Sequence, residues 1–230
     1  MDTPKLILQT QVDNFKKWWS ENYTVAEIKE LKTDDPGYPD WDIIEDYFEQ
    51  LLKNSLIKGL DKNDQINLLW LIARNWDIGR MIGWLYEKNP LSNLGNLKEE
   101  DFIMLSKTLI ELDNPEFNDA KSQFASSFKK FKTLTPEIAN ILLDYFNDND
   151  EYTKRTSLSS LGKLGYSDLM NLINNSWGCV DNEHYKIGCL RMIDMYVKDK
   201  EIMSKYLNYA DNIEGEYLKQ FVEDLRKNYR

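Results

Sequence analysis

The apolar residues of segment 152–177 follow a helical spacing that predicts two helices joined by a tight turn. Leu158, Leu161 and Leu164 recur on one face of the first helix. Gly165 follows at the position where a left-handed residue commonly ends a helix, and Ser167 is expected to cap the next one. The second helix carries four apolar residues, Leu169, Met170, Leu172 and Ile173. We therefore expect this segment to form a helical hairpin.

The same pattern returns after a shift of 32 residues, from position 150 to 182 to 214. A fixed period of this size is typical of helical solenoids, in which each repeat is a pair of helices. The shift superposes one helix start and two core positions in each repeat. The helix starts are Asp150, Asn182 and Glu214, and the core positions are Leu158, Leu190 and Val222, then Leu161, Ile193 and Leu225.

Two of these units resemble a known repeat family. The first opens with Lys154 and Arg155, carries the leucine triplet and ends in L-G-K-L-G, and in these features it resembles a HEAT-type repeat. The second, H-Y-K-I-G-C-L-R-M-I-D-M-Y, is similar but lacks the closing glycine. The resemblance covers 150–225 and implies an all-α, right-handed α-α superhelix of stacked hairpins. It names an architecture and brings no catalytic residues with it.

The rest of the chain is predicted to form further helices, so that 1–230 is expected to be a single α-solenoid domain with irregular helices over 1–60. Thr24 and Glu27 have the spacing of a capping box, and Thr135 before Pro136 is a strong helix start. Segment 34–39 holds two prolines and a glycine and is predicted to be a loop. The expected helices are 6–19, 24–31, 41–57, 65–74, 78–88 and 98–112, with two more beginning near 115 and 136.

Two of these segments have distinctive faces. The helix of 65–74 is apolar on nearly every side, which suits a helix packed between neighbours. The helix of 41–57 is predicted to turn an acidic face to solvent. That face consists of Asp42, Glu45, Asp46 and Glu49, opposite an apolar face of Trp41, Ile44, Phe48, Leu51 and Leu52.

Charge narrows the classes of partner. The chain of 230 residues has a formal net charge of −10 and a pI near 4.8, which disfavours nucleic acid because binding to phosphates depends on Lys and Arg. The same charge favours a basic protein partner. We expect a cytoplasmic protein with free thiols, because only Cys179 and Cys189 occur and no signal peptide or membrane-spanning run is apparent.

The chain offers little catalytic chemistry. His184 is its single histidine, and it is expected at the exposed start of a helix, while Cys189 shares a face with core residues. Cys179 lacks the C-x-x-C spacing of a zinc clamp, and the glycines form no phosphate-binding loop. We therefore expect no catalytic residue, no metal site and no cofactor.

A nucleic-acid enzyme is the alternative that stays open. Certain HEAT-like DNA glycosylases use an Asp, an Arg and tryptophans on a concave face, which Trp76, Asp77, Arg80 and Trp84 superficially resemble. The charge argues against it, because the chain has only one modest basic cluster. That cluster is Lys129, Lys130 and Lys132, followed later by Lys154 and Arg155.

The remaining candidate site is a surface. The second helix of each solenoid hairpin tends to line the concave side, where a protein partner can bind. The exposed residues expected there are Arg80, Trp84, Asp168, Asn171, Asn175, Lys205 and Asn208. Our leading hypothesis is a non-enzymatic protein-binding solenoid, in its most specific form a bacterial immunity protein that occludes a basic toxin. An adaptor in a larger protein assembly is equally consistent with this surface.

Overall fold

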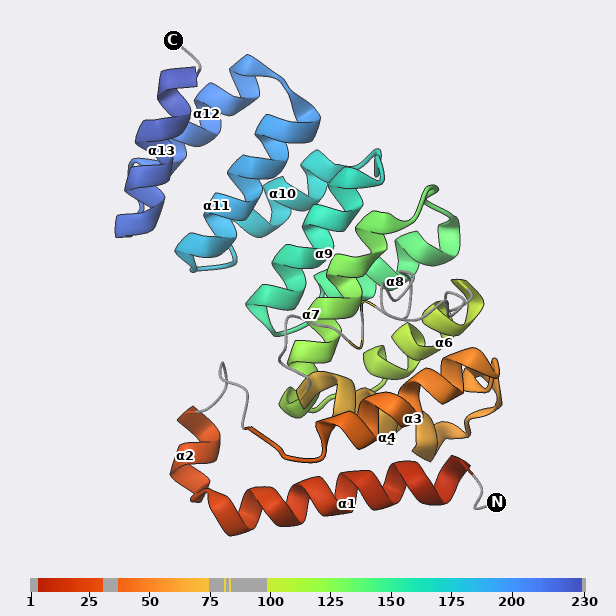
Figure 1. Ribbon diagram of the computed structural model, residues 1–230. Coiled ribbons are helices and arrows are strands. Elements are labelled where there is room, and N and C mark those ends of the chain that lie inside the picture. The colour runs from red at the N-terminus through yellow and green to blue at the C-terminus, as the bar shows by residue number, and fades with distance from the viewer. Residues whose placement is uncertain (1–3, 31–36, 75–80, 82, 84–98, 229–230) are drawn as a thin grey trace. The chain divides into compact units, whose positions relative to one another are not determined.

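The computed structural model describes residues 4–30, 37–74, 81, 83 and 99–228, and every regular element within these ranges is a helix (Figure 1). The predicted all-α class is therefore confirmed. The chain divides into two compact units, Met1–Phe124 and Ala125–Arg230. The single continuous domain remains a prediction. Within the described ranges, no helix combines the length and apolar character that crossing a bilayer requires.

The first unit is built around α4, which packs against α1 and α6. All seven residues from Leu68 to Arg74 are buried, as expected for a helix with neighbours on several sides. The helices of this unit are α1 (Pro4–Asn22), α2 (Val25–Glu30), α3 (Trp41–Lys53), α4 (Lys62–Arg74) and α6 (Glu99–Ile110), with α7 (Asn118–Ser127) at the boundary. Short 3₁₀ turns lie at Ile57–Gly59 and Pro115–Phe117.

An aromatic cluster surrounds Phe15 in this unit. Its ring is fully buried and lies 4.5 to 5.9 Å from five other rings, those of Trp18, Trp19, Tyr38, Trp41 and Trp70. The buried guanidinium of Arg74 stacks 4.4 Å from the Trp70 ring and donates a hydrogen bond of 2.6 Å to the Glu116 carbonyl. Stacking and this hydrogen bond together compensate a charge that would be costly to bury alone.

One prediction for the faces of helix α3 is wrong. Ile44, Phe48 and Leu51 are buried and Asp42 and Asp46 are exposed, as expected. Glu45 was assigned to the solvent face but is buried, with 8% of its surface exposed. It lies one residue after Ile44, at the edge of the apolar face, so α3 buries a wider face than its apolar residues alone mark out.

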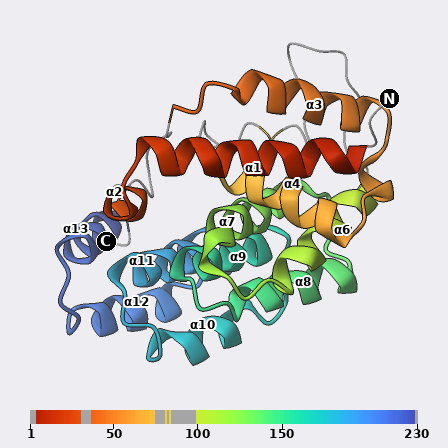
Figure 2. The same cartoon turned by 90° about the horizontal axis from the view of Figure 1, so that it is seen from below.

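The second unit contains α8 (Pro136–Phe146), α9 (Glu151–Lys163), α10 (Leu169–Trp177), α11 (Glu183–Met192), α12 (Lys200–Ala210) and α13 (Glu216–Asn228). Helices α9, α11 and α13 lie side by side, each in contact with the next (Figure 1). Helix α8 packs on α9, α10 contacts α9 and α11, and α12 contacts α11 and α13. Seen from below, α10 and α12 lie on the same side of the α9–α11 pair (Figure 2). A π-helical turn at Ile193–Val197 follows α11.

The predicted core positions of the 32-residue period are confirmed as buried. The first set is Leu158, Leu190 and Val222, with exposed fractions of 0%, 0% and 4%. The second set is Leu161, Ile193 and Leu225, with exposed fractions of 0%, 0% and 6%. Both positions of the period are thus apolar and buried in all three units.

The predicted helix starts are confirmed in two cases. Asp150 accepts a hydrogen bond from the Thr153 amide at 2.8 Å, and Asn182 accepts one from the Tyr185 amide at 3.1 Å. Such side-chain caps satisfy amides that a helix leaves unpaired at its start. The third start, Glu214, is wrong, because α13 begins at Glu216.

The cap of α13 comes from another helix. Oε2 of Glu183, at the start of α11, accepts a hydrogen bond from the Leu218 amide at 3.2 Å. A Cβ on Gly215 would lie 3.0 Å from the Glu183 Cβ, so the glycine permits this close approach. A carboxylate from a neighbouring helix therefore does what Asp150 and Asn182 do within their own helices.

Two turn predictions have different outcomes. Gly165 has a φ of +77°, which confirms the left-handed end of α9. Ser167 does not cap α10, because the helix begins at Leu169 and Asp168 takes the preceding position without a capping hydrogen bond. The predicted capping box of Thr24 and Glu27 is confirmed, with amide to side-chain distances of 2.7 and 3.3 Å.

Candidate binding groove

The second unit contains an open groove of about 490 Å³. Its walls are one face each of α9, α11 and α13, and the end of α7 with the following turn closes one side. Residues three or four apart on a helix share a face, which is why each helix contributes residues at that spacing. The charged and aromatic lining residues are Lys129, Tyr152, Arg155, His184, Arg191, Tyr217, Phe221 and Asp224.

Arg155 is held across the contact of α9 with α11. Its Nε donates to Oε1 of Glu151, one turn earlier, at 2.7 Å, and its guanidinium lies 4.9 Å from the centre of the Tyr152 ring. A Cβ on Gly188 would lie 2.8 Å from both Cγ and Cδ of Arg155. The missing side chain on α11 therefore provides the space in which the arginine stem lies.

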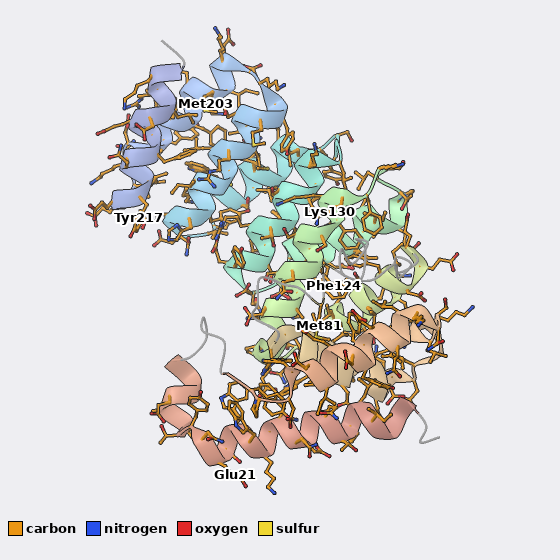
Figure 3. All side chains as sticks on the ribbon, in the orientation of Figure 1. Glu21, Met81, Phe124, Lys130, Met203 and Tyr217 are labelled. Atoms are coloured by element: carbon orange, nitrogen blue, oxygen red, sulfur yellow. The ribbon has the colours of Figure 1, made fainter. Side chains whose placement is uncertain are left out.

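Aromatic rings and cations alternate along the other wall. The Arg191 guanidinium of α11 lies 5.2 Å from the ring centre of Phe221 on α13. The His184 and Tyr217 rings lie 5.5 Å apart at an interplanar angle of 32°. In Figure 3, Tyr217 lies at the N-terminal end of α13, beside the first turn of α11. Tyr152 and Tyr217 are 52% and 65% exposed, so the groove presents aromatic residues to solvent.

Lys129 adds a cation at the closed side. It is half-buried, and its Nζ makes no hydrogen bond or ion pair with any residue that the structure describes. Burial lowers the pKa of Lys129, and the positive charge of Arg155 lowers it further. Both effects raise the cost of the charged lysine in the absence of a counterion.

The groove carries more positive than negative charge. Lys129, Arg155 and Arg191 face a single lining carboxylate, Asp224. Asp224 already accepts hydrogen bonds from Lys227 at 2.7 Å and Gln220 at 3.3 Å. The groove is therefore locally cationic, although the chain as a whole has a formal charge of −10.

The residues predicted from sequence lie elsewhere. Asp168, just before α10, and Asn171 and Asn175 on α10 are exposed, and side-chain hydrogen bonds of 3.2 and 3.4 Å join them. Lys205 and Asn208 are exposed on α12, which is linked to α10 by a hydrogen bond from Tyr206 to Asn174. We name this surface of α10 and α12 the amide face. None of these five residues lines the groove.

The remaining candidates have mixed outcomes. Arg80 and Trp84, together with Trp76 and Asp77, lie outside the described residues, whereas Met81 between them is buried. His184 is exposed at a helix start and Cys189 is fully buried, as expected. The described residues contain no group of three or more His, Cys, Asp or Glu side chains arranged to hold a metal ion.

Sequence reasoning missed the groove, although its cations were visible. Lys129 and Arg155 belong to the basic cluster noted in the sequence, but the structure separates that cluster. Lys154 turns away from the groove, donates to the Phe146 carbonyl at 2.6 Å and lies over the Phe146 ring. The useful signal was the recurrence of an aromatic or histidine ring three to seven residues before an arginine, at Tyr152 and Arg155 and at His184 and Arg191.

The groove is equipped to bind an anionic group beside an apolar one. Arginine offers a planar fork of donors that matches a carboxylate, and lysine adds a point charge. The exposed rings offer faces for apolar contact. No protein-family model matches this chain, and no match was found among curated proteins or solved structures.

Proposed function

We propose that this protein is a non-enzymatic, protein-binding α-solenoid and that its binding site is the groove of α9, α11 and α13. The 32-residue period and its buried core positions support stacked HEAT-like hairpins in a right-handed superhelix. In this fold, binding sites are built from the surface that successive repeats share, and the groove spans three successive first helices.

One observation carries the choice of the groove. Arginine and tyrosine are enriched among residues that dominate protein interfaces, and the groove brings Arg155, Arg191, Tyr152 and Tyr217 together in one concave site. Two exposed tyrosines beside two arginines suit a partner surface better than bulk water. The amide face of α10 and α12 has no comparable concentration of these residue types.

The most specific form of the proposal is a bacterial immunity protein that occludes a basic toxin. The net charge of −10 would speed encounter with a basic protein at low salt. Screening limits this attraction to about 8 Å at physiological ionic strength. Once docked, the partner would meet the local chemistry of the groove, so long-range steering and local recognition have different origins.

The test is affinity capture with the full chain, followed by reconstitution with the purified partner. The groove variant combines Arg191→Ala and Tyr217→Ala, and its matched control on α12 combines Lys205→Ala and Tyr209→Ala. Both pairs remove one exposed cation and one exposed tyrosine. We expect the wild type and the control to form a stoichiometric complex and the groove variant to lose it.

Other results would contradict parts of the proposal. If only the α12 control lost the complex, the binding site would be the amide face and not the groove. Failure of the wild type to form a complex with any captured and purified protein would contradict the protein-binding function itself. For the immunity version, a toxin whose growth arrest is not relieved by co-expression would be the opposing result.

A further inference from the structure

We infer that the groove binds an acidic segment of the partner, in which a carboxylate side chain lies beside an aromatic or aliphatic one. This inference rests on the proposed protein-binding function and adds the chemistry of the bound segment. It assigns the carboxylate to the cations Lys129, Arg155 and Arg191, and the apolar side chain to Tyr217 and Phe221.

The first step is the uncompensated charge. Three lining cations face one carboxylate, and that carboxylate, Asp224, is already bound by Lys227 and Gln220. Among the described residues, Glu151 forms an ion pair with Arg155 only, through the Nε of Arg155. Neither Lys129 nor Arg191 has an ion pair within the described part of the chain.

The second step is the repulsion between Lys129 and Arg155. Two like charges held near each other in a partly desolvated site destabilise each other, and a bound anion would relieve this cost. Binding energy is then gained from an interaction that the free protein leaves unsatisfied. A basic segment would add to this repulsion, and a neutral segment would form weaker hydrogen bonds with these two residues than a carboxylate would.

The third step is preorganisation. Arg155 is fixed by Glu151, by the Tyr152 ring and by the space over Gly188, and Arg191 is placed by Phe221. A donor whose orientation is already set loses less conformational entropy on binding than a free side chain. The hydrogen bond to Glu151 uses only the Nε, and the planar guanidinium has two further nitrogens that can bind a carboxylate.

Size and composition favour a peptide segment over other anions. A groove of about 490 Å³ lies within the usual range for sites that hold several side chains or a small organic ligand, and it greatly exceeds the volume of one phosphate. Exposed rings at Tyr152 and Tyr217 provide apolar contact that an inorganic anion cannot use. Single-stranded nucleic acid would need a basic track along several phosphates, whereas the groove has three lining cations.

The experiment selects ligands from a displayed library of short random peptides on the full chain. Selected peptides are then measured by fluorescence anisotropy against the wild type and two single variants, Lys129→Gln in the groove and Lys205→Gln on α12. Each substitution removes one positive charge, so the general effect of charge is matched. A peptide of the same composition with Asp and Glu replaced by Asn and Gln, and an oligothymidylate, serve as competing probes.

We expect the selected peptides to be enriched in Asp or Glu next to aromatic or aliphatic residues. Their Kd should rise at least about tenfold in Lys129→Gln and change less than about twofold in Lys205→Gln. The amide counterpart should bind at least about tenfold more weakly than the acidic peptide. Weaker binding at higher salt is expected for all acidic peptides.

Four results would overturn the inference. They are enrichment of basic or neutral peptides, equal losses in Lys129→Gln and Lys205→Gln, tighter binding of oligothymidylate than of any peptide, and no enrichment at all. If any of these is found while the wild type still forms a stoichiometric complex with a protein partner, the acidic segment is rejected and the protein-binding function stands. If that complex is also absent, the proposed function fails with it.

Discussion

Gly188 and Arg155 fit together across two helices, since a Cβ at Gly188 would lie 2.8 Å from the Arg155 Cγ and Cδ. This glycine lies in the middle of α11, where glycine is otherwise unfavourable relative to alanine. The arginine that gains from it lines the groove. A position that weakens the helix is thus tied to the placement of a binding-site side chain.

Gly188→Ala is expected to destabilise the protein by about 1 to 3 kcal/mol, because the methyl group must displace the packed stem of Arg155. The higher helix propensity of alanine offsets only part of this cost. Urea denaturation gives the free energy of unfolding. Gly178→Ala is the control, because a Cβ there meets nothing within 4 Å. An equal effect at both positions would mean that Arg155 moves aside at no cost.

Leu158→Ala and Leu190→Ala are each expected to lower the free energy of unfolding by about 2 to 5 kcal/mol. Both side chains are fully buried at equivalent positions of the 32-residue period. The midpoint of urea denaturation measures the effect. An unmoved midpoint for Leu158→Ala would contradict the proposed repeat register.

Asn171→Ala is expected to change the free energy of unfolding by less than about 0.5 kcal/mol, because the side chain is exposed on α10. It loses only side-chain hydrogen bonds to Asp168 and Asn175. The same variant reports on binding. Unchanged affinity for the captured partner would support the groove over the amide face.

Alkaline pH should weaken the fold through Cys189. Burial raises the pKa of the Cys189 thiol to about 12 from 9.0. Between these values the unfolded chain loses the thiol proton and the folded chain keeps it, so rising pH favours unfolding. The contribution is at most about 1.4 kcal/mol per pH unit.

The check compares wild type with Cys189→Ala by urea denaturation at pH values below and above 9. The wild type should lose stability more steeply above pH 9, because only the wild type carries the buried thiol. Parallel pH profiles would mean that the thiol of Cys189 ionises as readily in the folded state as in the unfolded chain.

Arg74→Ala is expected to lower the free energy of unfolding by about 3 kcal/mol. The change removes the stacking on Trp70 and the hydrogen bond to the Glu116 carbonyl, and it leaves that carbonyl without its donor. Lys17→Ala, at an exposed ion pair on α1, is the control and should change stability by less than about 1 kcal/mol. Equal losses of stability in Arg74→Ala and Lys17→Ala would mean that Arg74 does not stabilise the core of the first unit.

The sequence predicted helix starts and buried positions well, because both features depend on residues that are close together in the chain. The caps of Asp150, Asn182 and Thr135 need only a side chain and an amide three residues later. Burial of Leu158 and Leu190 follows from the 3.6-residue period alone. Signals of this kind are complete within one turn of helix.

Contacts between helices were beyond the same reasoning. The groove depends on α9, α11 and α13 lying side by side, and these helices are separated in the chain by α10 and α12. Arg155 was visible as part of a basic cluster, but its position is set by Gly188, more than thirty residues later. The choice of the second helices as a binding surface assumed a direction of curvature, which the period of the apolar residues does not determine.

The cap that Glu183 places on the Leu218 amide joins the last helix to the one two before it. Breaking α11 at its start would remove a hydrogen-bond acceptor from the first turn of α13, so opening of the two helices is coupled. The Leu218 amide should therefore exchange with solvent deuterium in the same cooperative event as the amides of the first turn of α11. The first turn of α13 is thus protected from fraying by a carboxylate that lies 35 residues before Leu218 in the chain.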